Sequence, residues 1–207
     1  MALHSLQRRA LGLDVPPRGA ERRGLRRHYT LTPWSEDVEV WWGPRSEAYV
    51  TPVAPRTVGV AVLTADVGTF DEHLADFPEL AARLAEGTPA SAVRGAGPFG
   101  RRSRRRVAGR VLLVADAAGY VDALTGEGLS LGFAQARAAV GALARDRPGE
   151  YERAWRRLSW PADLPTAVLV RAGRVPALRR RIVRAAAAAP TLFDAAVSAV
   201  ALTGKDR

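Results

Sequence analysis

The fold is decided by the stretch Gly109-Arg-Val-Leu-Leu-Val-Ala-Asp-Ala-Ala-Gly-Tyr-Val-Asp-Ala-Leu-Thr-Gly-Glu-Gly-Leu-Ser-Leu-Gly132. Its apolar run at residues 111–114 is typical of a strand that is buried on both faces, as in a parallel sheet. A loop of small residues follows, and residues 127–145 have the periodicity of a helix. The apolar positions that share one face of this helix are Leu129, Phe133, Ala136 and Val140. The stretch therefore predicts a strand–loop–helix unit.

Asp116 lies at the carboxyl end of the expected strand, which is where α/β sheets bind ligands. A carboxylate at this point can accept hydrogen bonds from the hydroxyls of a ribityl or ribose chain. Gly119, Gly126 and Gly128 have no Cβ, so a flat ring can lie close to the backbone there. The N–H groups at the start of the helix near Glu127 favour negative charge, such as that on the N1–C2=O edge of a reduced flavin. The alternative interpretation is a purely structural unit in which Asp116 caps a helix.

At these residues the sequence resembles the second FAD-binding motif of flavoprotein monooxygenases and geranylgeranyl reductases. The matching positions are Asp116, Ala117, Ala118, Gly119, Leu124, Thr125, Gly126, Glu127 and Gly128. Two positions depart from the motif: Ala115 stands where glycine is usual, and Ala123 stands where proline is usual. The resemblance implies that Asp116 binds the ribityl chain and that the following loop and helix start hold the isoalloxazine. The cofactor-binding residues implied in this way are Asp116, Ala117, Gly119, Leu124, Thr125, Gly126, Glu127 and Gly128.

A second resemblance lies at the start of the chain. Leu3-His4-Ser5 followed by Arg8-Arg9 is similar to the tail of the family motif Asp-Gly-x-x-Ser-x-x-Arg, with Met1-Ala2 in place of Asp-Gly. The family also has a Gly-x-Gly-x-x-Gly unit for the FAD pyrophosphate, and residues 95–100 match this pattern literally. However, Pro98 lies inside the match and an arginine run follows it, so we interpret these residues as a strand and turn. The sequence is therefore expected to be a truncated C-terminal part that holds little FAD alone.

The remaining segments predict an α+β protein with a partial FAD/NAD(P)-binding fold. Residues 25–31, 38–42, 48–53 and 57–63 are rich in β-branched and aromatic residues, and the short turns between them predict an antiparallel meander on the substrate side. One strand of an incomplete parallel sheet and a helical C-terminal region complete the expected fold. Further expected elements are a helix at 70–84 interrupted at Pro78 and capped or charged by Asp71, a strand at 91–93, a helix at 151–158, and two or three helices from 164 to 202, broken near Pro176 and Pro190. The expected divisions are residues 1–19, 20–106, 107–147 and 148–207.

The charge of the chain leaves two interpretations open. The net charge is +10, and Lys205 is the only lysine among 31 basic residues. Binding to nucleic acid or to a membrane surface is one interpretation; solvated arginine is the other, and it is favoured because arginine is spread along the chain without an aromatic stacking platform. Residues 101–106 hold five arginines and are expected to form a solvated turn, with phosphate contact as the alternative.

Several kinds of site are excluded by composition and spacing. Cysteine is absent, which excludes disulfides, thiolate metal sites and cysteine nucleophiles. His4, His28 and His73 lack metal-ligand spacing. Ser130 and Ser159 lack the context of a nucleophile elbow, so hydrolase chemistry is not expected. Residues 1–20 contain no apolar stretch of signal-peptide length, no apolar run in the sequence is long enough to span a membrane, and a cytoplasmic location is expected.

The resemblance implies an FAD-dependent oxidoreductase that hydroxylates or reduces an apolar organic substrate with electrons from NAD(P)H. A geranylgeranyl or prenyl-chain reductase is the alternative within this family, and a basic nucleic-acid-binding protein is the alternative of another class. The C-terminal helices are expected to pack over the substrate side and to contact a membrane surface peripherally. Catalytic residues and oligomeric state are not assigned by the sequence.

Overall fold

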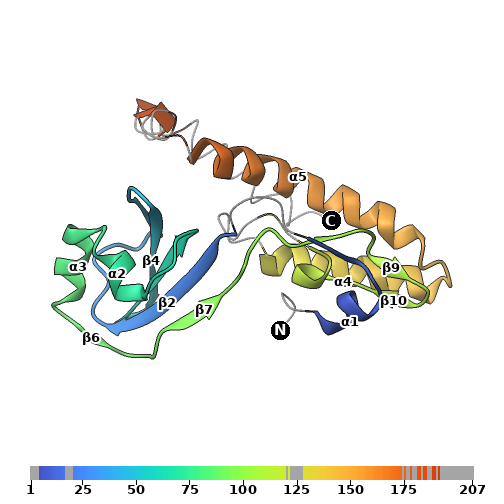
Figure 1. Cartoon of the computed structure of the whole chain (residues 1–207), viewed down its shortest axis with the longest axis horizontal. Coiled ribbons are helices and arrows are strands. Elements are labelled where there is room, and N and C mark those ends of the chain that lie inside the picture. Colours follow the sequence, from blue (N-terminus) through green and yellow to red (C-terminus); the bar gives the residue numbers. More distant parts are fainter. Residues whose placement is uncertain are drawn as a thin grey trace. The chain divides into compact units, whose positions relative to one another are not determined.

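The structure is a computed structural model, and the chain in it divides into two compact units. It describes residues 5–16, 21–119, 121 and 128–173, and the positions 175, 178, 181, 182, 184, 185, 188, 189 and 191. Unit 1 consists of Met1–Pro17 and Gly100–Arg207, and unit 2 is Arg18–Phe99 (Figure 1). The four-part division expected from the sequence stays a prediction.

Unit 2 is built on an antiparallel sheet. Its strands are β2 (Arg23–Thr30), β3 (Glu39–Trp42), β4 (Ser46–Ala54), β5 (Thr57–Thr64), β6 (Thr88–Pro89) and β7 (Arg94–Ala96). The order is β3-β4-β5-β2-β6, and β7 also pairs with β2. All four long strands predicted from the sequence are present. The meander is confirmed only for β3 to β5, because β2 pairs with β5, with Tyr29 opposite Val58. The prediction of a strand at 91–93 is wrong, because these residues form the connection between β6 and β7.

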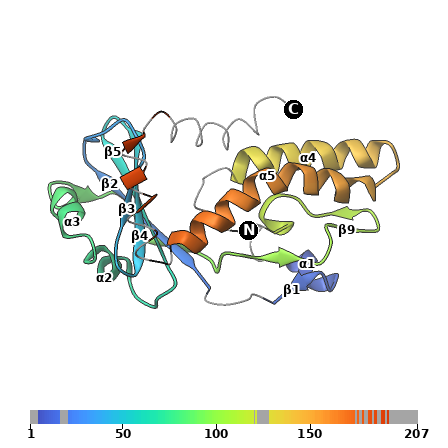
Figure 2. The ribbon, with the colours of Figure 1, turned by 90° about the horizontal axis from the view of Figure 1, so that it is seen from above.

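The core of unit 2 forms between the sheet and two short helices. Alternate residues of β5, namely Val58, Val60 and Val62, are almost fully buried. Helices α2 (Phe70–Leu74) and α3 (Pro78–Leu84) pack on one side of the sheet (Figure 2). The interruption at Pro78 is confirmed, because proline occupies the first position of α3.

The start of α2 shows which of the two expected roles Asp71 has. Thr69 caps the helix, and a capping box joins its side chain and backbone to Glu72. Asp71 lies in the first turn and forms an ion pair with Arg27 at 2.8 Å. The acidic side chain therefore charges the helix start but does not cap it.

Unit 1 contains short strand pairs and two long helices. Its elements are α1 (Leu6–Ala10), β1 (Asp14–Val15), β8 (Arg102–Ser103), β9 (Val107–Ala108), β10 (Val111–Leu112), the 3₁₀ turn η1 (Ala115–Ala117), α4 (Gly128–Ala144) and α5 (Glu150–Gly173). The β1–β8 and β9–β10 pairs are antiparallel. Helices α4 and α5 lie side by side (Figure 2).

Burial of the expected strand at 111–114 differs from the prediction. Leu113 is buried, but Val111 is 42% exposed, so burial on both faces is wrong for Val111. Strand β10 has β9 as its antiparallel partner, and the described residues contain no parallel strand pair. Membership of a parallel sheet stays a prediction.

The apolar face predicted on this helix is largely exposed in α4. Leu129, Phe133 and Val140 are 78%, 73% and 66% exposed. The residues that α4 buries are Gln135, Ala139 and Ala142. Alanine and glycine allow α4 to approach η1 closely, since a Cβ added at Gly132 would lie 3.0 Å from the Ala115 Cβ.

Helix α5 is one continuous element. It includes the residues of the helix expected at 151–158 and runs through Pro161 and Pro165 as far as Gly173. Proline removes a helical hydrogen bond, and the packing of Tyr151, Trp155 and Ser159 compensates for that loss. The prediction of two separate helices before residue 173 is therefore wrong. Within the described residues, no helix combines the length and apolar character needed to cross a bilayer.

Candidate functional site

The turn after β10 is the centre of the site, and its backbone is strained. Val114 is extended, and Ala115–Ala117 form the turn η1 that carries Asp116. Ala115 has a φ of 51°, in the left-handed region. This conformation costs a non-glycine residue about 1–2 kcal/mol. The position is the one where the resembling motif has glycine, and the strain gives a physical reason for that preference.

A buried polar pair fixes this turn from the helix side. The Ala115 N–H donates to Gln135 Oε1 at 2.7 Å, and Gln135 Nε2 donates to Ser159 Oγ at 3.1 Å. Gln135 on α4 and Ser159 on α5 are each 1% exposed. Both polar groups of the glutamine amide are thus used, and three elements are joined at one point.

Arg8 fixes the same turn from the N-terminal side. Its guanidinium donates from Nη1 to the carbonyl oxygens of Asp116 and Ala117, at 3.4 and 3.2 Å. Its Nε donates to Asp14 Oδ1 at 2.7 Å, and the residue is only 2% exposed. Ser5 caps α1 and accepts from the Arg8 N–H. The serine and arginine of the N-terminal motif are therefore structurally joined to the Asp116 turn.

The two described glycines of the predicted site differ in what the fold demands. Gly119 has a φ of 106°, and an added Cβ would lie 2.8 Å from the Arg101 carbonyl oxygen. Its backbone pairs with Arg102, so the fold itself requires glycine there. No described atom lies within 4 Å of a Cβ added at Gly128. The space that a Gly128 side chain would enter is therefore not filled by the described residues.

The Asp116 carboxylate is available as an acceptor. Asp116 is half-buried, and its carboxylate makes no hydrogen bond or ion pair with the described part of the chain. Ala117 contributes its carbonyl to Arg8, and Ala118 beside it is fully buried. The other predicted cofactor-binding residues, Leu124, Thr125, Gly126 and Glu127, lie outside the described residues.

Tyr151 holds the strand that leads into the turn. Its hydroxyl donates to the Leu113 carbonyl oxygen at 2.8 Å, and its side chain is fully buried. Burial raises the pKa of the Tyr151 hydroxyl above its usual range, so the group stays a donor at all ordinary pH values. Sequence reasoning missed Tyr151 and Gln135. Gln135 could have been identified from the sequence, because it is a glutamine on the small-residue face of α4.

Residues 101–106 are only partly a solvated turn. Arg102, Arg104 and Arg105 are exposed. In contrast, the Arg106 guanidinium lies 3.6 Å from the centre of the Trp155 ring and donates to Glu152 Oε1 at 2.8 Å. Arg106 therefore packs against α5 and belongs to the scaffold of unit 1.

The literal Gly-x-Gly-x-x-Gly match at residues 95–100 has the surroundings of a strand and turn. It overlaps strand β7 (Arg94–Ala96), and the next element is strand β8 rather than a helix. A pyrophosphate cradle needs the N-terminus of a helix directly after the glycines. The interpretation of these residues as a strand and turn is confirmed.

Several solved structures similar to this chain are flavoproteins. Neither a family model nor a curated protein matches the sequence. The flavin-dependent brominase Bmp2 is 18% identical with a TM-score of 0.68, over 90% of this chain and 51% of its own. A flavoprotein/dehydrogenase from Cytophaga hutchinsonii is 16% identical with a TM-score of 0.68, over 86% of this chain and 49% of its own. The halogenase PltM in complex with phloroglucinol and FAD is 16% identical with a TM-score of 0.65, over 84% of this chain and 42% of its own.

These likenesses establish the fold. This chain combines helices with an antiparallel sheet in the manner of FAD-binding flavoproteins. It spans about half the length of the structures that it matches, or less.

Proposed function

We propose that this chain carries the part of an FAD site that binds the ribityl chain and the isoalloxazine ring, in a flavin-dependent oxidoreductase of the monooxygenase type. The observation that carries the proposal is the Asp116 turn. Its carboxylate has no partner in the described part of the chain, while Arg8 and Gln135 hold the backbone on either side of it. The flavoprotein fold supports the same assignment.

The residues present fit the cofactor on two counts. The half-buried Asp116 carboxylate has no partner among the described residues and needs hydrogen-bond donors, and ribityl hydroxyls are donors of the matching kind. The open space at Gly128 accommodates a flat ring near the start of α4, where backbone N–H groups favour negative charge. Leu124, Thr125, Gly126 and Glu127 complete the proposed set.

The chemistry of the reaction belongs to the cofactor, which supplies the redox step when it is bound. The role of this chain is to bind and orient it. Arg8, Gln135 and Ser159 keep the turn in a strained conformation, so that the Asp116 carboxylate is held in place before the ligand arrives. Preorganisation of this kind lowers the ordering cost of binding.

The proposed reaction is hydroxylation or reduction of an apolar organic substrate, with NAD(P)H as electron donor. This part of the proposal comes from the sequence resemblance, as does the alternative of a prenyl-chain reductase. A protein loaded with FAD is expected to oxidise NADH or NADPH faster when the correct apolar substrate is present. Unchanged nicotinamide oxidation with aromatic, polyketide-like and prenyl substrates would remove both reactions.

Separate titrations with three ligands test which half of FAD the chain binds. FAD, riboflavin and ADP are titrated separately into the purified chain, with flavin fluorescence and calorimetry as readouts. We expect FAD and riboflavin to bind with affinities within a few-fold of each other, since both carry the ribityl chain and ring. ADP is expected to show no binding. Binding of ADP without riboflavin, or of neither flavin up to its solubility limit, would contradict the proposal.

A further inference from the structure

Helix α5 has an inner face that builds the core of unit 1. Tyr151, Trp155 and Ser159 follow one another at intervals of four residues and are 0%, 8% and 1% exposed. They contact the β10 strand end, Arg106 and Gln135. These three positions of α5 are therefore occupied by contacts within unit 1.

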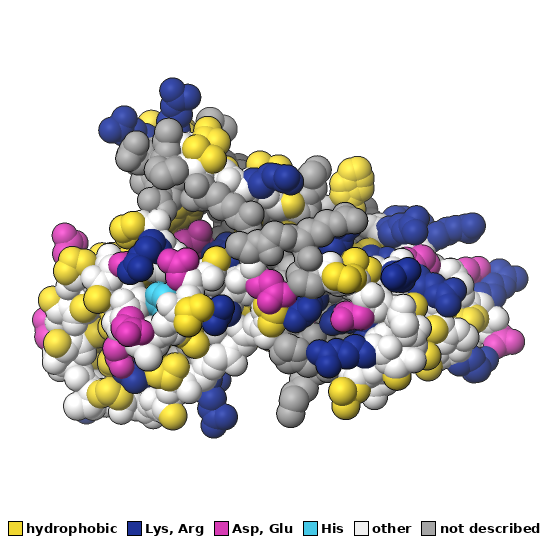
Figure 3. Space-filling view, in the orientation of Figure 1, with side chains coloured by type: hydrophobic (Ala, Val, Ile, Leu, Met, Phe, Trp, Pro, Cys, Tyr) yellow, Lys and Arg dark blue, Asp and Glu magenta, His cyan; other side chains and the backbone are white. Residues whose placement is uncertain are grey.

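The outer face of α5 is basic and aromatic. Arg153, Arg157, Trp160, Val168 and Arg171 recur at helical spacing and are all exposed. Trp160 is 60% exposed and Val168 is 58% exposed, so this face presents apolar as well as basic side chains to solvent. In Figure 3, dark-blue and yellow side chains alternate along α5.

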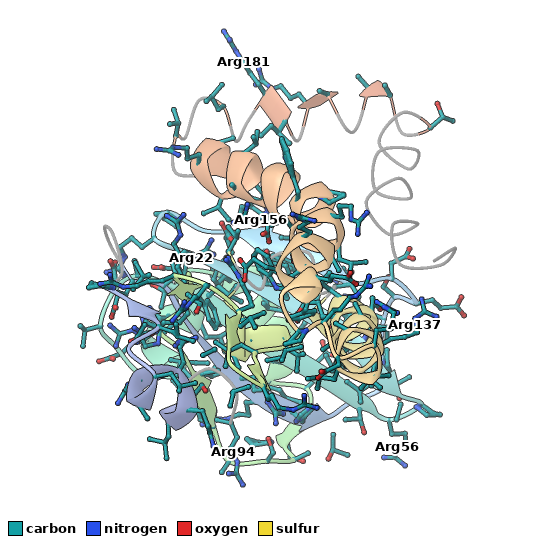
Figure 4. The ribbon with its side chains drawn as sticks, turned by 90° about the vertical axis from the view of Figure 1, so that its right-hand side faces the viewer. Arg22, Arg56, Arg94, Arg137, Arg156 and Arg181 are labelled. Carbon is teal, nitrogen blue, oxygen red and sulfur yellow. The ribbon has the colours of Figure 1, made fainter. Side chains whose placement is uncertain are left out.

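Among the described residues, the two glutamates in the first turn of α5 are engaged by other arginines and do not pair with the arginines of this outer face. Glu150 pairs with Arg145 and Arg147 on the preceding turn. Glu152 binds Arg106 at 2.8 Å and lies 3.8 Å from Arg156, which is labelled in Figure 4. Arg153, Arg157 and Arg171 form no ion pair within the described part of the chain.

We propose that the outer face of α5 is a peripheral docking surface for an anionic lipid bilayer. A helix of 24 residues is about 36 Å long and can lie flat in the interface. Its arginines would then reach lipid phosphates, while Trp160 and Val168 enter the boundary between headgroups and acyl chains. Each arginine near an anionic surface increases partitioning about fivefold.

The apolar residues favour a bilayer over nucleic acid. A phosphate backbone would satisfy the arginines but leave Trp160 and Val168 in water. Nucleic-acid surfaces that use aromatic residues present several of them for successive bases, whereas this face has Trp160 alone. The proposal rests on α5 and is independent of the proposed flavin site.

Vesicle flotation with the full chain tests the proposal. Vesicles of equal parts phosphatidylglycerol and phosphatidylcholine are compared with vesicles of phosphatidylcholine alone, at low and high salt. We expect binding to the anionic vesicles only, weakened but not abolished by salt because Trp160 contributes apolar burial. Equal recovery with both vesicle types, or no flotation at all, would overturn the proposal.

Charge-matched variants locate the surface. The α5 variant carries Arg153→Gln, Arg157→Gln and Arg171→Gln. The control variant removes the same charge from exposed positions of unit 2, with Arg26→Gln, Arg56→Gln and Arg94→Gln. The α5 variant should bind anionic vesicles about a hundredfold more weakly, and the control within about fivefold of the parent.

Two further results decide between occupants. Trp160→Gln should make the remaining vesicle binding fully sensitive to salt. Equal weakening in the α5 and control variants would mean that only net charge matters, and this would overturn the docking surface. Binding to duplex or single-stranded DNA that depends on the α5 arginines, with no vesicle binding, would assign the face to nucleic acid instead.

Discussion

Gln135 accepts a hydrogen bond from the backbone N–H of Ala115 at 2.7 Å and thereby stabilises a left-handed residue next to Asp116. The acceptor comes from α4, which begins at Gly128. Because Gln135 is 1% exposed and its amide also donates to Ser159, the bond cannot be replaced by water without opening the core. The local shape of the proposed flavin site therefore depends on the packing of α4 against α5.

Gln135→Met should destabilise the chain by about 1–3 kcal/mol, because it leaves the Ala115 N–H buried without an acceptor. Methionine has a similar volume, so cavity formation contributes little. Urea unfolding measures the change. Arg137→Met on the exposed side of the same helix is the control and should be nearly neutral. Equal effects of the two substitutions would show that the hydrogen bond is unimportant.

Ala115→Gly should stabilise the chain by about 1 kcal/mol, because glycine adopts a φ of 51° without the clash of a Cβ. The same change removes the atom that a Cβ at Gly132 would meet at 3.0 Å. Gly132→Ala should therefore be less favourable in the parent than in the Ala115→Gly background, with a coupling of about 0.5–3 kcal/mol. Additive effects in this double-mutant cycle would contradict the close approach of α4 to the turn.

Arg8→Met should destabilise the chain by about 3 kcal/mol, because it breaks the ion pair with Asp14. This value is at the lower end for a buried ion pair, since Asp14 is 31% exposed and its carboxylate can be hydrated again. Two backbone carbonyls of the Asp116 turn also lose their donor. Arg8→Lys should restore little of this, since an ammonium cannot donate in two fixed directions. Thermal unfolding compares these variants with Arg9→Met, an exposed neighbour that should change stability by less than about 0.5 kcal/mol.

Asp163→Asn should stabilise the chain at neutral pH. Burial on α5 raises the pKa of the Asp163 carboxyl above its ordinary value of 3.8, and Arg106 partly opposes the shift. The folded state then holds this proton more tightly than the unfolded state, so stability falls as the pH rises from about 3.8 through the folded pKa. The advantage of the asparagine variant should therefore shrink as the pH is lowered through this window. If the Tm difference between the two proteins stays constant from about pH 3 to pH 7, the buried Asp163 carboxyl is not the cause of the stabilisation.

The sequence predicted the elements that local patterns determine. Strands β2 to β5 and the break at Pro78 follow from β-branched residues and turn signals, which act over a few positions. The pairing of β2 with β5 is a long-range choice that no local pattern encodes. Periodicity identified the apolar face of α4 but not whether that face is covered, and the structure shows it exposed.

The position of the Asp116 turn in the fold was predicted, but the contacts that support it were not. Asp116, Ala117 and Gly119 are found at the end of β10 as expected, and Ala115 shows the strain that a glycine position implies. The bonds from Arg8 and Gln135 join segments that are distant in sequence, so only the folded chain brings them together. Continuity of α5 through Pro161 was also missed, because proline is read as a helix break while tertiary packing overrides it.

The most direct test of the account is an NMR titration of the ¹⁵N-labelled chain with riboflavin. We expect the shifted amides to include those of Ala115, Asp116 and Gly119, and the affinity to fall roughly ten- to a hundredfold in Asp116→Ala, as for a lost charged hydrogen bond of about 1.5–3 kcal/mol. Asp37→Ala, an exposed carboxylate of unit 2, is the control and should bind like the parent. Riboflavin affinity that is unchanged in Asp116→Ala, or amide shifts confined to unit 2, would contradict the assignment of Asp116 to a flavin site.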